Sequence, residues 1–338
     1  MLRVVHVLPH RGGGAETYID LLEAIPGTAH RRIPLSPSRR LGDALAALPR
    51  GYRALASAAR GADVVHVHGD SAAIIALPLR PAVLTTHGLH LLRRTRGPAG
   101  AAVGAWVIAA VAASRVTVCT SESESQELRS LLPLRLHSRL TVVANGIEPP
   151  VSDPARRAAA RALLGLADGD VAGVYLGELE ERKDPLTAVH AARAAGRPFV
   201  LLVAGDGPLR AAVEALAGSS VRVLGYRDDP DALLAAADVF VMPSRREGLS
   251  FAVLEAMGHG LAMVVADGPG NPEAVGDAGL VLPAGDVGAY TAAFRELAYD
   301  SSRRAALGER ARERVVERFT ADALRAGVLT AYERAQGA

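Results

Sequence analysis

The sequence is short of cysteine, aromatic residues and long apolar runs, and each shortage narrows what the protein can be. Cys119 is the only cysteine among 338 residues, so no disulfide bond can form within the chain, which suits the reducing cytoplasm. Aromatic residues make up 4% of the sequence and no nucleic-acid recognition motif occurs, so we expect no nucleic-acid partner. The longest apolar run, residues 98–113, is shorter than a membrane span, and the first residues resemble a strand rather than a secretory signal.

Charge is distributed unevenly along the chain. Residues 1–146 hold 17 basic and 9 acidic residues, whereas residues 147–338 hold 21 and 27. The basic first half favours an anionic partner, such as a phosphorylated acceptor or a lipid surface, and ordinary solvated arginine is the open alternative. The cluster Arg93-Arg94-Thr95-Arg96 is one place where an anionic or lipid-linked acceptor could be held. Peripheral contact with the inner face of the membrane is therefore one expectation, and an ordinary exposed turn is the other.

Short apolar runs alternate with helix-like segments, which is typical of a parallel α/β architecture. Five runs predict strands of a first sheet: residues 4–8, 64–68, 82–86, 115–120 and 140–143. Five more predict a second sheet: residues 171–176, 199–204, 221–224, 239–242 and 263–266. Several of these runs are continuously apolar, as expected where helices cover both faces of a sheet.

The segment Asn145-Gly146-Ile147-Glu148-Pro149-Pro150 lies between the two sets of strands and is the best candidate for a linker. It predicts an N-terminal Rossmann-like domain of residues 1–146 on the acceptor side and a C-terminal one of residues 147–318 on the donor side. The sequence does not assign the final helix, 319–338, to either domain, and packing back on the N-terminal domain is open to it. Ligands of such doubly wound domains bind at the carboxyl ends of the strands.

The clearest chemical signal follows the predicted strand at 239–242. There Ser250 is positioned to cap a helix running to about Met257, and the unpaired N–H groups at a helix start suit a phosphate. Glu255 lies in an otherwise apolar turn, where a carboxylate needs hydrogen bonds that a ribose diol would supply. Glu247 precedes the helix and could grip sugar hydroxyls. A helix-start carboxylate and an exposed one are the structural alternative.

A second cluster, Gly177-Glu178-Leu179-Glu180-Glu181-Arg182-Lys183-Asp184, follows the predicted strand at 171–176 and contains the only lysine of the chain. A compact ammonium in a loop after a strand suits a diphosphate. An ordinary surface charge is the usual interpretation of a single lysine, and it stays open for Lys183 at this point.

The run Pro9-His10-Arg11-Gly12-Gly13-Gly14-Ala15-Glu16 lies between the first strand and the first helix, where glycines allow close backbone approach to a phosphate or an acceptor.

His87 follows a predicted strand and therefore lies at the carboxyl end of the sheet. His6, His66 and His68 alternate along strands, and we expect them to be buried structural histidines. No grouping has the spacing of a metal site and no Asp-x-Asp pair stands where a divalent ion would hold a donor, so no metal is expected.

Glu247 and Glu255, with seven residues between them, resemble the glutamate pair of the family 4 retaining glycosyltransferases, also called glycosyltransferase group 1. Four further segments resemble motifs of that family in order: Asn145-Gly146-Ile147, Val203–Leu209, Asp267–Glu273 and Ala278–Pro283. The resemblance implies the GT-B fold, an α/β architecture of two doubly wound Rossmann-like domains with parallel sheets facing across a cleft. It also implies a role in bacterial glycoconjugate or natural-product biosynthesis.

The resemblance implies an enzyme that moves a sugar from a nucleoside-diphosphate-sugar to an acceptor hydroxyl with retention and without a metal. The acceptor would attack the face from which the diphosphate leaves, and a donor phosphate oxygen would take its proton. The implied catalytic residues are His87, Glu247 and Lys183, with Glu247 contacting the sugar, Glu255 the ribose and His87 the neighbourhood of the transferred sugar. The implied donor-binding residues are Gly12, Gly13, Gly14, Arg182, Lys183, Glu247, Gly248, Leu249, Ser250 and Glu255.

One departure from the family pattern concerns Glu178, which stands where the family usually has an arginine directly after the glycine. Arg182 could supply the missing positive charge. Two other functions stay open at this point: a nucleotide-sugar epimerase on the same fold, and a non-catalytic nucleotide-sugar-binding or scaffold protein. The nucleoside-diphosphate-sugar is a substrate in either enzymatic case, so no cofactor is implied.

Overall fold

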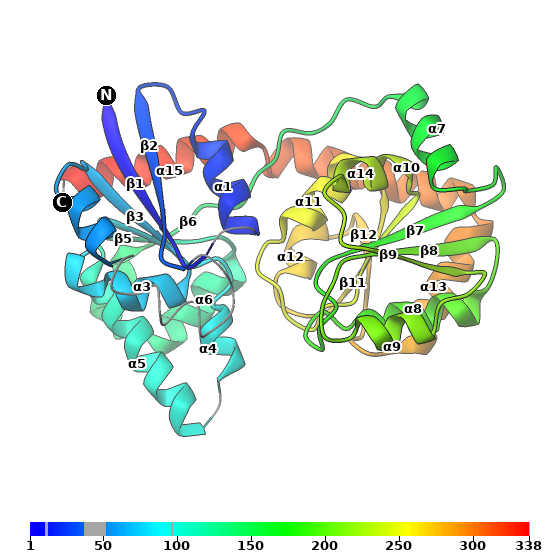
Figure 1. Ribbon diagram of the computed structural model, residues 1–338, viewed down its shortest axis with the longest axis horizontal. Helices are drawn as coiled ribbons and strands as arrows, with labels where there is room; N and C mark the ends of the chain where they lie inside the picture. The colour runs from blue at the N-terminus through cyan, green and yellow to red at the C-terminus, as the bar shows by residue number, and fades with distance from the viewer. Residues whose placement is uncertain (11–12, 37–51, 96, 338) are drawn as a thin grey trace. The chain divides into compact units, whose positions relative to one another are not determined.

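The computed structural model describes residues 1–10, 13–36, 52–95 and 97–337 and divides the chain into two compact units. Unit 1 comprises Met1–Asn145 and Ala321–Ala338, and unit 2 comprises Gly146–Thr320. Each unit is built on a six-stranded parallel sheet (Figure 1). The chain therefore leaves unit 1 once and returns to it with its last helix.

The sheet of unit 1 has the strand order β2-β1-β3-β4-β5-β6. The chain runs outward from β1 to β2 and then places β3 on the other side of β1, so the direction of winding reverses between β1 and β3. The strands are β1 (Leu2–Leu8), β2 (Thr28–Pro34), β3 (Val64–His68), β4 (Val83–Thr85), β5 (Val116–Cys119) and β6 (Leu140–Val142).

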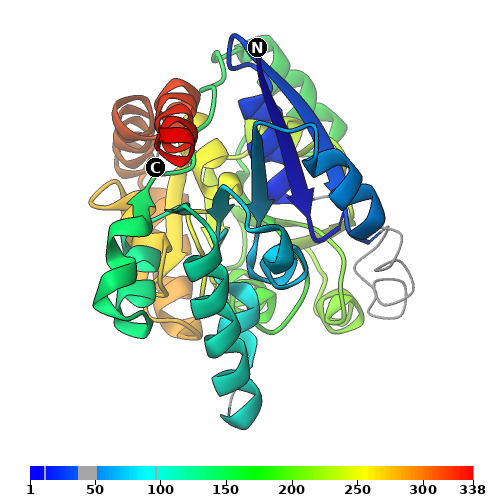
Figure 2. The same ribbon diagram turned by 90° about the vertical axis from the view of Figure 1, so that its left-hand side faces the viewer.

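Helices cover both faces of this sheet (Figure 2). One face carries α1 (Gly14–Leu22) and α15 (Ala321–Gly337), and the latter contacts β3, β4 and β5. The other face carries α3 (Asp70–Ala76), α4 (His90–Arg94), α5 (Gly97–Ala113) and α6 (Glu122–Leu131), with the short 3-10 turns Leu77–Leu79 and Leu134–Arg139. Apolar side chains of this second face, among them Val7, Leu84 and Val111, form the core of the unit. Among the described residues, no helix combines the length and the apolar character needed to cross a membrane.

The sheet of unit 2 has the strand order β12-β11-β10-β7-β8-β9, and its direction of winding reverses between β7 and β10. Its strands are β7 (Val171–Leu176), β8 (Phe199–Ala204), β9 (Val221–Gly225), β10 (Val239–Met242), β11 (Ala262–Ala266) and β12 (Gly279–Leu282). The helices of the unit are α7 (Pro154–Leu163), α8 (Pro185–Ala195), α9 (Arg210–Ala215), α10 (Pro230–Ala236), α11 (Phe251–Gly258), α12 (Asn271–Val275), α13 (Val287–Tyr299) and α14 (Ser301–Arg318).

The core of unit 2 is apolar on both sides of the sheet because helices cover both faces. Every residue of β7, β8, β10 and β11 is buried. Helices α8 and α13 pack together on one face, where the rings of Phe199 and Phe294 stack with centroids 4.4 Å apart. On the other face α11 packs against α14. The loops that leave these strands therefore start from a buried, closely packed base.

All ten predicted strands are confirmed, and two strands were not predicted. The missed strand β2, Thr-Ala-His-Arg-Arg-Ile-Pro, lies at the edge of its sheet and buries only Ile33 fully, so it lacks an apolar run. The missed strand β12, Gly-Leu-Val-Leu, also forms an edge and has no fully buried residue. Edge strands of this kind carry a weaker hydrophobic signal than central ones.

Candidate active site

The loops that follow β7 and β10 leave the sheet of unit 2 at the same edge, on the two sides of the point where the winding reverses. They are joined by a hydrogen bond of 3.0 Å from the backbone N–H of Arg245 to the carbonyl of Arg182. Open α/β sheets bind ligands at such a switch point, outside the carboxyl ends of the strands. The two clusters singled out in the sequence are therefore brought together here.

Lys183 and Glu247 form the centre of this site. The Lys183 Nζ atom lies 2.7 Å from Oε1 of Glu247, and a guanidinium nitrogen of Arg182 lies 3.5 Å from the same oxygen. The Lys183 and Glu247 side chains are both largely buried, 14% and 5% exposed respectively. Burial acts to raise the pKa of Glu247, but the charges of Lys183 and Arg182 outweigh it and hold the pKa below its ordinary value. Glu247 is therefore ionised at neutral pH and can only accept hydrogen bonds.

Arg182 is fixed in place by groups from both loops. Its guanidinium pairs with Glu180 at 2.7 Å and donates to the carbonyl of Arg246 at 3.1 Å. Glu178, the departure from the family pattern, is half-buried, and its carbonyl accepts a hydrogen bond of 2.8 Å from the Tyr175 hydroxyl. That Arg182 supplies the positive charge missing at position 178 stays a prediction.

The loop before α11 is held by close backbone packing at Gly270. A side chain there would place its Cβ 2.3 Å from the carbonyl oxygen of Gly248, and the residue has a φ of +89°. The neighbouring N–H of Glu247 donates to the carbonyl of Pro269 at 3.0 Å. Glycine at position 270 is thus required both by the space and by the left-handed conformation, and it sets the position of Glu247.

Helix α11 begins directly after this loop. Ser250 holds the N-cap position, as predicted, but within unit 2, all of whose residues are described, its side chain accepts no capping hydrogen bond. Its backbone has the extended conformation of an N-cap, so the position is right although the hydroxyl does not turn toward the helix. The first N–H groups of the helix are consequently left for a ligand.

Glu255 lies in the second turn of α11. Burial, together with the negative charge of Asp231, raises the pKa of its carboxyl to about 7. Within the fully described unit 2, no residue donates a hydrogen bond to its side chain. A half-buried carboxyl group without an internal donor is what a vicinal diol from a ligand would satisfy.

In unit 1 the predicted residues lie at the carboxyl ends of strands. Gly13 (φ 88°) is the N-cap residue of α1 and Gly14 begins that helix, whereas Gly12 lies outside the described residues. His87 follows β4 in a left-handed conformation (φ 51°), and its Nε2 lies 2.9 Å from Nδ1 of His68. Burial, and to a lesser extent His90, lowers the pKa of His87 to about 3, so its ring is neutral at physiological pH.

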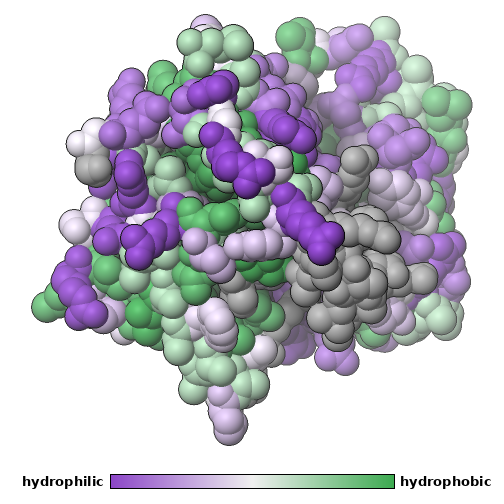
Figure 3. Space-filling model, turned by 60° about the vertical axis from the view of Figure 1, so that its left-hand side comes forward, coloured by the Kyte–Doolittle hydropathy of each residue, from purple (hydrophilic) through white to green (hydrophobic). Residues whose placement is uncertain are grey.

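In the arginine cluster that begins at the end of α4, Arg93 is not free for a ligand. The guanidinium of Arg93 is buried, with 7% of the side chain exposed, and donates from Nε to Glu127 at 2.9 Å. Figure 3 shows weakly coloured surface over the projecting end of α5, in contrast to the purple side chains gathered above it. Arg93 therefore has an internal partner, and Arg96 lies outside the described residues.

The structure brings Arg182, Lys183 and Glu247 together, places Gly248, Leu249 and Ser250 in the same loop and sets Glu255 on the helix that follows. Sequence reasoning missed the supporting side chains. Glu180 orients Arg182, and Asp184, at the start of α8, pairs with Arg245 at 3.1 Å. The adjacent acidic and basic residues at 180–184 were the available signal. Sequence reasoning also missed that ring nitrogens of His6, His66 and His68 all lie within 4.8 Å of one another.

Comparison with known proteins agrees with this architecture. Residues 172–300 match the family of glycosyl transferases group 1, and residues 3–150 match glycosyltransferase family 4. The alpha-maltose-1-phosphate synthase of Mycobacterium tuberculosis is 33% identical over 325 residues, which cover 84% of this chain and 82% of that protein. The lipopolysaccharide core biosynthesis glycosyltransferase LpsE of Rhizobium meliloti is 35% identical over 157 residues, covering 44% and 46%.

Solved structures show the same fold along the whole chain. Sucrose-phosphate synthase from Thermosynechococcus elongatus superposes with a TM-score of 0.82 at 20% identity, covering 99% of both chains. Anabaena HepE in complex with UDP and glucose superposes with a TM-score of 0.82 at 16% identity, covering 98% of this chain and 100% of that one. With its two parallel six-stranded sheets, its GT-B neighbours and its sequence relatives, the chain belongs to the family 4 glycosyltransferases of group 1 and is a glycosyltransferase.

Proposed function

We propose that this glycosyltransferase uses a nucleoside-diphosphate-sugar, transfers the sugar with retention of configuration and needs no metal ion. The observation that carries the proposal is the juxtaposition of Lys183, Arg182 and Glu247 at the switch point of unit 2, beside the start of α11. It joins two cations suited to a diphosphate with an ionised carboxylate suited to sugar hydroxyls. The other donor-site residues of unit 2, Gly248, Leu249, Ser250 and Glu255, follow within eight positions of Glu247.

The diphosphate becomes the leaving group, and its charge grows as the bond to the sugar breaks. Lys183 and Arg182 supply positive charge from one loop, and the free N–H groups of α11 supply hydrogen bonds from the other. In the absence of donor, Glu247 forms an ion pair with the Lys183 ammonium. A bound diphosphate would compete for that ammonium, which would free the carboxylate for sugar hydroxyls.

Glu255 is assigned to the ribose of the nucleotide. Its raised pKa and the lack of a donor to its side chain within unit 2 support this role. Hydrogen bonds from two ribose hydroxyls would favour the ionised carboxylate, so donor binding would lower the pKa of Glu255.

Retention is proposed to proceed by attack on the face from which the diphosphate leaves. The bond between the anomeric carbon and the phosphate oxygen breaks, the bond to the acceptor oxygen forms, and the acceptor proton passes to the departing phosphate oxygen. The ionised carboxylate of Glu247 forms ion pairs with Lys183 and Arg182. This supports a role in binding sugar hydroxyls rather than in forming a covalent intermediate.

Metal independence is supported by the chemistry of the candidate site. Within unit 2, no group of three His, Cys, Asp or Glu side chains is close enough to share a metal ion. Asp184, which follows Lys183 directly, is engaged by Arg245 at 3.1 Å. Positive charge next to the expected diphosphate comes instead from Lys183 and Arg182, so no separate cofactor is proposed.

We assign the acceptor to unit 1 and propose that it is anionic or lipid-linked, which would bring the protein to the inner face of the membrane. The excess of arginine in this half of the sequence and the exposure of Trp106 on α5, at 44%, support the proposal. Tryptophan fluorescence in the presence of anionic and neutral vesicles tests it, because Trp106 is the only tryptophan. Unchanged fluorescence and no co-sedimentation with anionic vesicles would rule out the contact with the membrane.

A thermal-shift screen with UDP, GDP, dTDP and ADP and their sugars, with and without EDTA, tests the donor site. HepE was solved with UDP, so UDP is the first nucleotide to try. We expect stabilisation by one nucleotide that survives EDTA, is lost in Lys183→Ala and Glu255→Ala, and is kept in the surface control Arg227→Ala. Absence of stabilisation by any nucleotide would favour a scaffold, and sugar isomerisation without acceptor would identify an epimerase. An inverted anomeric configuration in the product would overturn retention.

A further inference from the structure

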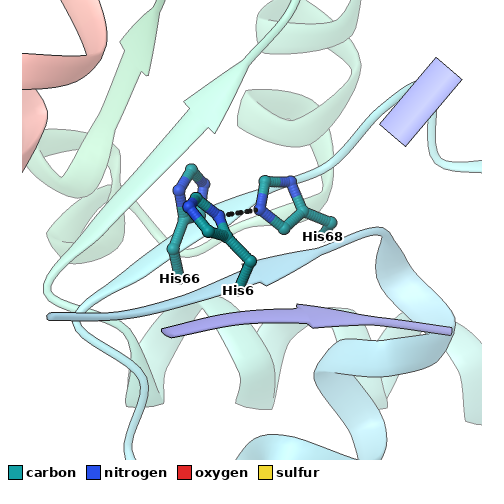
Figure 4. A group of neighbouring side chains, drawn as sticks. All are labelled: His6, His66 and His68. Atoms are coloured by element: carbon teal, nitrogen blue, oxygen red, sulfur yellow. Dashed lines mark hydrogen bonds between the residues drawn. The ribbon is translucent and has the colours of Figure 1, made fainter. Parts of the chain in front are cut away.

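Four histidines of unit 1, three on neighbouring strands and one in the loop after a fourth strand, form one continuous chain of hydrogen bonds. His30 Nδ1 lies 2.8 Å from His6 Nε2, His6 Nδ1 lies 2.9 Å from His68 Nε2, and His68 Nδ1 lies 2.9 Å from His87 Nε2. The contact between His6 and His68 is drawn in Figure 4. This chain of histidines crosses the sheet from β2 through β1 and β3 to the loop after β4, because these strands are neighbours in that order. It ends at His87, the predicted catalytic histidine.

All four rings are neutral near pH 7, since burial lowers the pKa of each of them. The charged groups around them add to this effect. Arg32 faces the chain from β2 and lowers the pKa of His6, His30 and His68, while Glu23 acts on His30 in the opposite direction. A neutral imidazole carries one proton, so each ring in the chain donates through one nitrogen and accepts through the other.

The direction of this chain is set at its far end by Thr28. The Thr28 hydroxyl donates its single proton to the carbonyl of Ile25 at 2.6 Å. Its oxygen also lies 2.6 Å from Nε2 of His30, so that nitrogen must be the donor of the second bond. Once His30 carries its proton on Nε2, its Nδ1 can only accept a proton donated by the next ring.

The same reasoning applies at every following ring. His6 must donate from Nε2 and accept at Nδ1, His68 must do the same, and His87 must donate from Nε2 to His68. The Nδ1 atom of His87 is then an unprotonated lone pair. Among the residues that the structure describes, none donates a hydrogen bond to it.

We propose that Thr28, His30, His6 and His68 are positioning residues that hold His87 in its Nε2–H tautomer, so that its Nδ1 accepts a hydrogen bond from a hydroxyl of the sugar. The assignment of His87 to the sugar rests on the proposed function. The tautomer itself depends only on hydrogen bonds within unit 1. It makes His87 selective for neutral sugars that present a hydroxyl, because a carboxylate oxygen of a uronic acid would meet a lone pair rather than a proton.

A buried metal site is the competing interpretation of these histidines. His6, His66 and His68 are close enough to share an ion, but every one of their ring nitrogens already faces a hydrogen-bonding partner. His66, which is outside the chain, lies 2.9 Å from the Tyr332 hydroxyl through Nδ1 and 2.7 Å from the Thr85 hydroxyl through Nε2. A metal ion would need lone pairs on ring nitrogens that must carry protons in the chain of histidines. The two interpretations therefore require different protonation of the same rings.

Two-bond proton–nitrogen NMR of protein labelled with 15N-histidine reads the tautomer of each ring directly. The sample is the ligand-free wild type, and the His87 signals are assigned by their loss in His87→Gln. We expect the Nε2–H form for His30, His6, His68 and His87. An Nδ1–H form of His87 in the wild type would overturn the proposal whether or not the protein is active. Loss of these N–H signals with one equivalent of Zn²⁺ bound would overturn it in favour of a metal site.

Variants at Thr28 test the effect on the reaction. Thr28→Val removes the hydroxyl that orients the chain, so His87 should show mixed tautomers and kcat/KM should fall about tenfold, whereas Thr28→Ser should restore both. Thr330→Val, which removes another hydroxyl bonded to a backbone carbonyl in unit 1, is the matched control and should change neither. If His87 keeps the Nε2–H tautomer in Thr28→Val, the role of Thr28 is refuted. Absence of transfer by the wild type would count against the proposed function and leave the tautomer result standing.

Discussion

Replacing Lys183 by methionine removes the ammonium from the candidate site and keeps most of the apolar stem. Glu247, with a side chain 5% exposed, then loses the cation at 2.7 Å and keeps only Arg182 at 3.5 Å. Removing one partner of a buried ion pair typically costs about 3–5 kcal/mol, because the remaining charge is left uncompensated. Since Arg182 remains, we expect the lower end, a loss of about 3 kcal/mol in the free energy of unfolding of unit 2.

The double variant Lys183→Met/Glu247→Gln separates the pair from its parts. It removes both charges, so it should recover about 2 kcal/mol of the loss seen in the single variant, as expected for directly coupled residues. It should not recover stabilisation by a nucleotide. Low pH should have the same effect as Glu247→Gln, because it protonates and so neutralises the Glu247 carboxylate. The pKa of Glu247 is lowered by folding, so its contribution to stability is present above about pH 4.5 and is lost as the pH falls through the folded-state pKa.

Urea unfolding followed by far-UV circular dichroism measures these differences. Trp106 is the only tryptophan and lies on α5 of unit 1, so its fluorescence serves as an internal control for a change confined to unit 2. Arg227→Met removes an exposed ion pair with Asp229 in the same unit and should leave the unfolding midpoint unchanged. The reasoning is refuted if Lys183→Met is as stable as the wild type, or if the double variant is no more stable than Lys183→Met.

Three further predictions concern the donor site. Donor affinity should rise between about pH 6 and pH 8 as Glu255, with a pKa of about 7, ionises; calorimetric titration should show this rise in the wild type and a flat profile in Glu255→Gln. Arg182→Ala should weaken donor affinity about tenfold, and an unchanged affinity would end the idea that Arg182 compensates for Glu178. Gly270→Ala should destabilise unit 2 by about 2 kcal/mol or more and abolish nucleotide stabilisation, whereas Gly218→Ala, where a Cβ meets no atom within 4 Å, should do neither.

The central strands and the order of the chemical motifs could be predicted because both depend on local sequence. A buried parallel strand is a continuous apolar run, and residues that follow such strands must lie at one edge of the sheet. The positions of Lys183 and Glu247 in the loops that follow their strands therefore followed from the pattern. Their contact did not, since it requires β7 and β10 to be neighbours although β8 and β9 lie between them along the chain.

The histidine chain shows the same limit more sharply. Alternation along strands correctly indicated that His6, His66 and His68 are buried. Their contacts depend on the parallel register, which sets His6 opposite His66, and on β2, an edge strand without an apolar run that carries His30. The direction of the protons depends in turn on one threonine hydroxyl. None of these facts is encoded within a single sequence window.

A chain with 37 arginines and one lysine also offers an unusually simple target for chemistry. A reagent that acylates amines meets one ammonium side chain besides the α-amino group of Met1, and the only thiol, on Cys119, is buried. The rate at which Lys183 is acylated would then measure how often its pair with Glu247 opens, and a donor bound at the site would alter that rate. Mass spectrometry of the unaltered protein could thus count donor occupancy without any introduced probe.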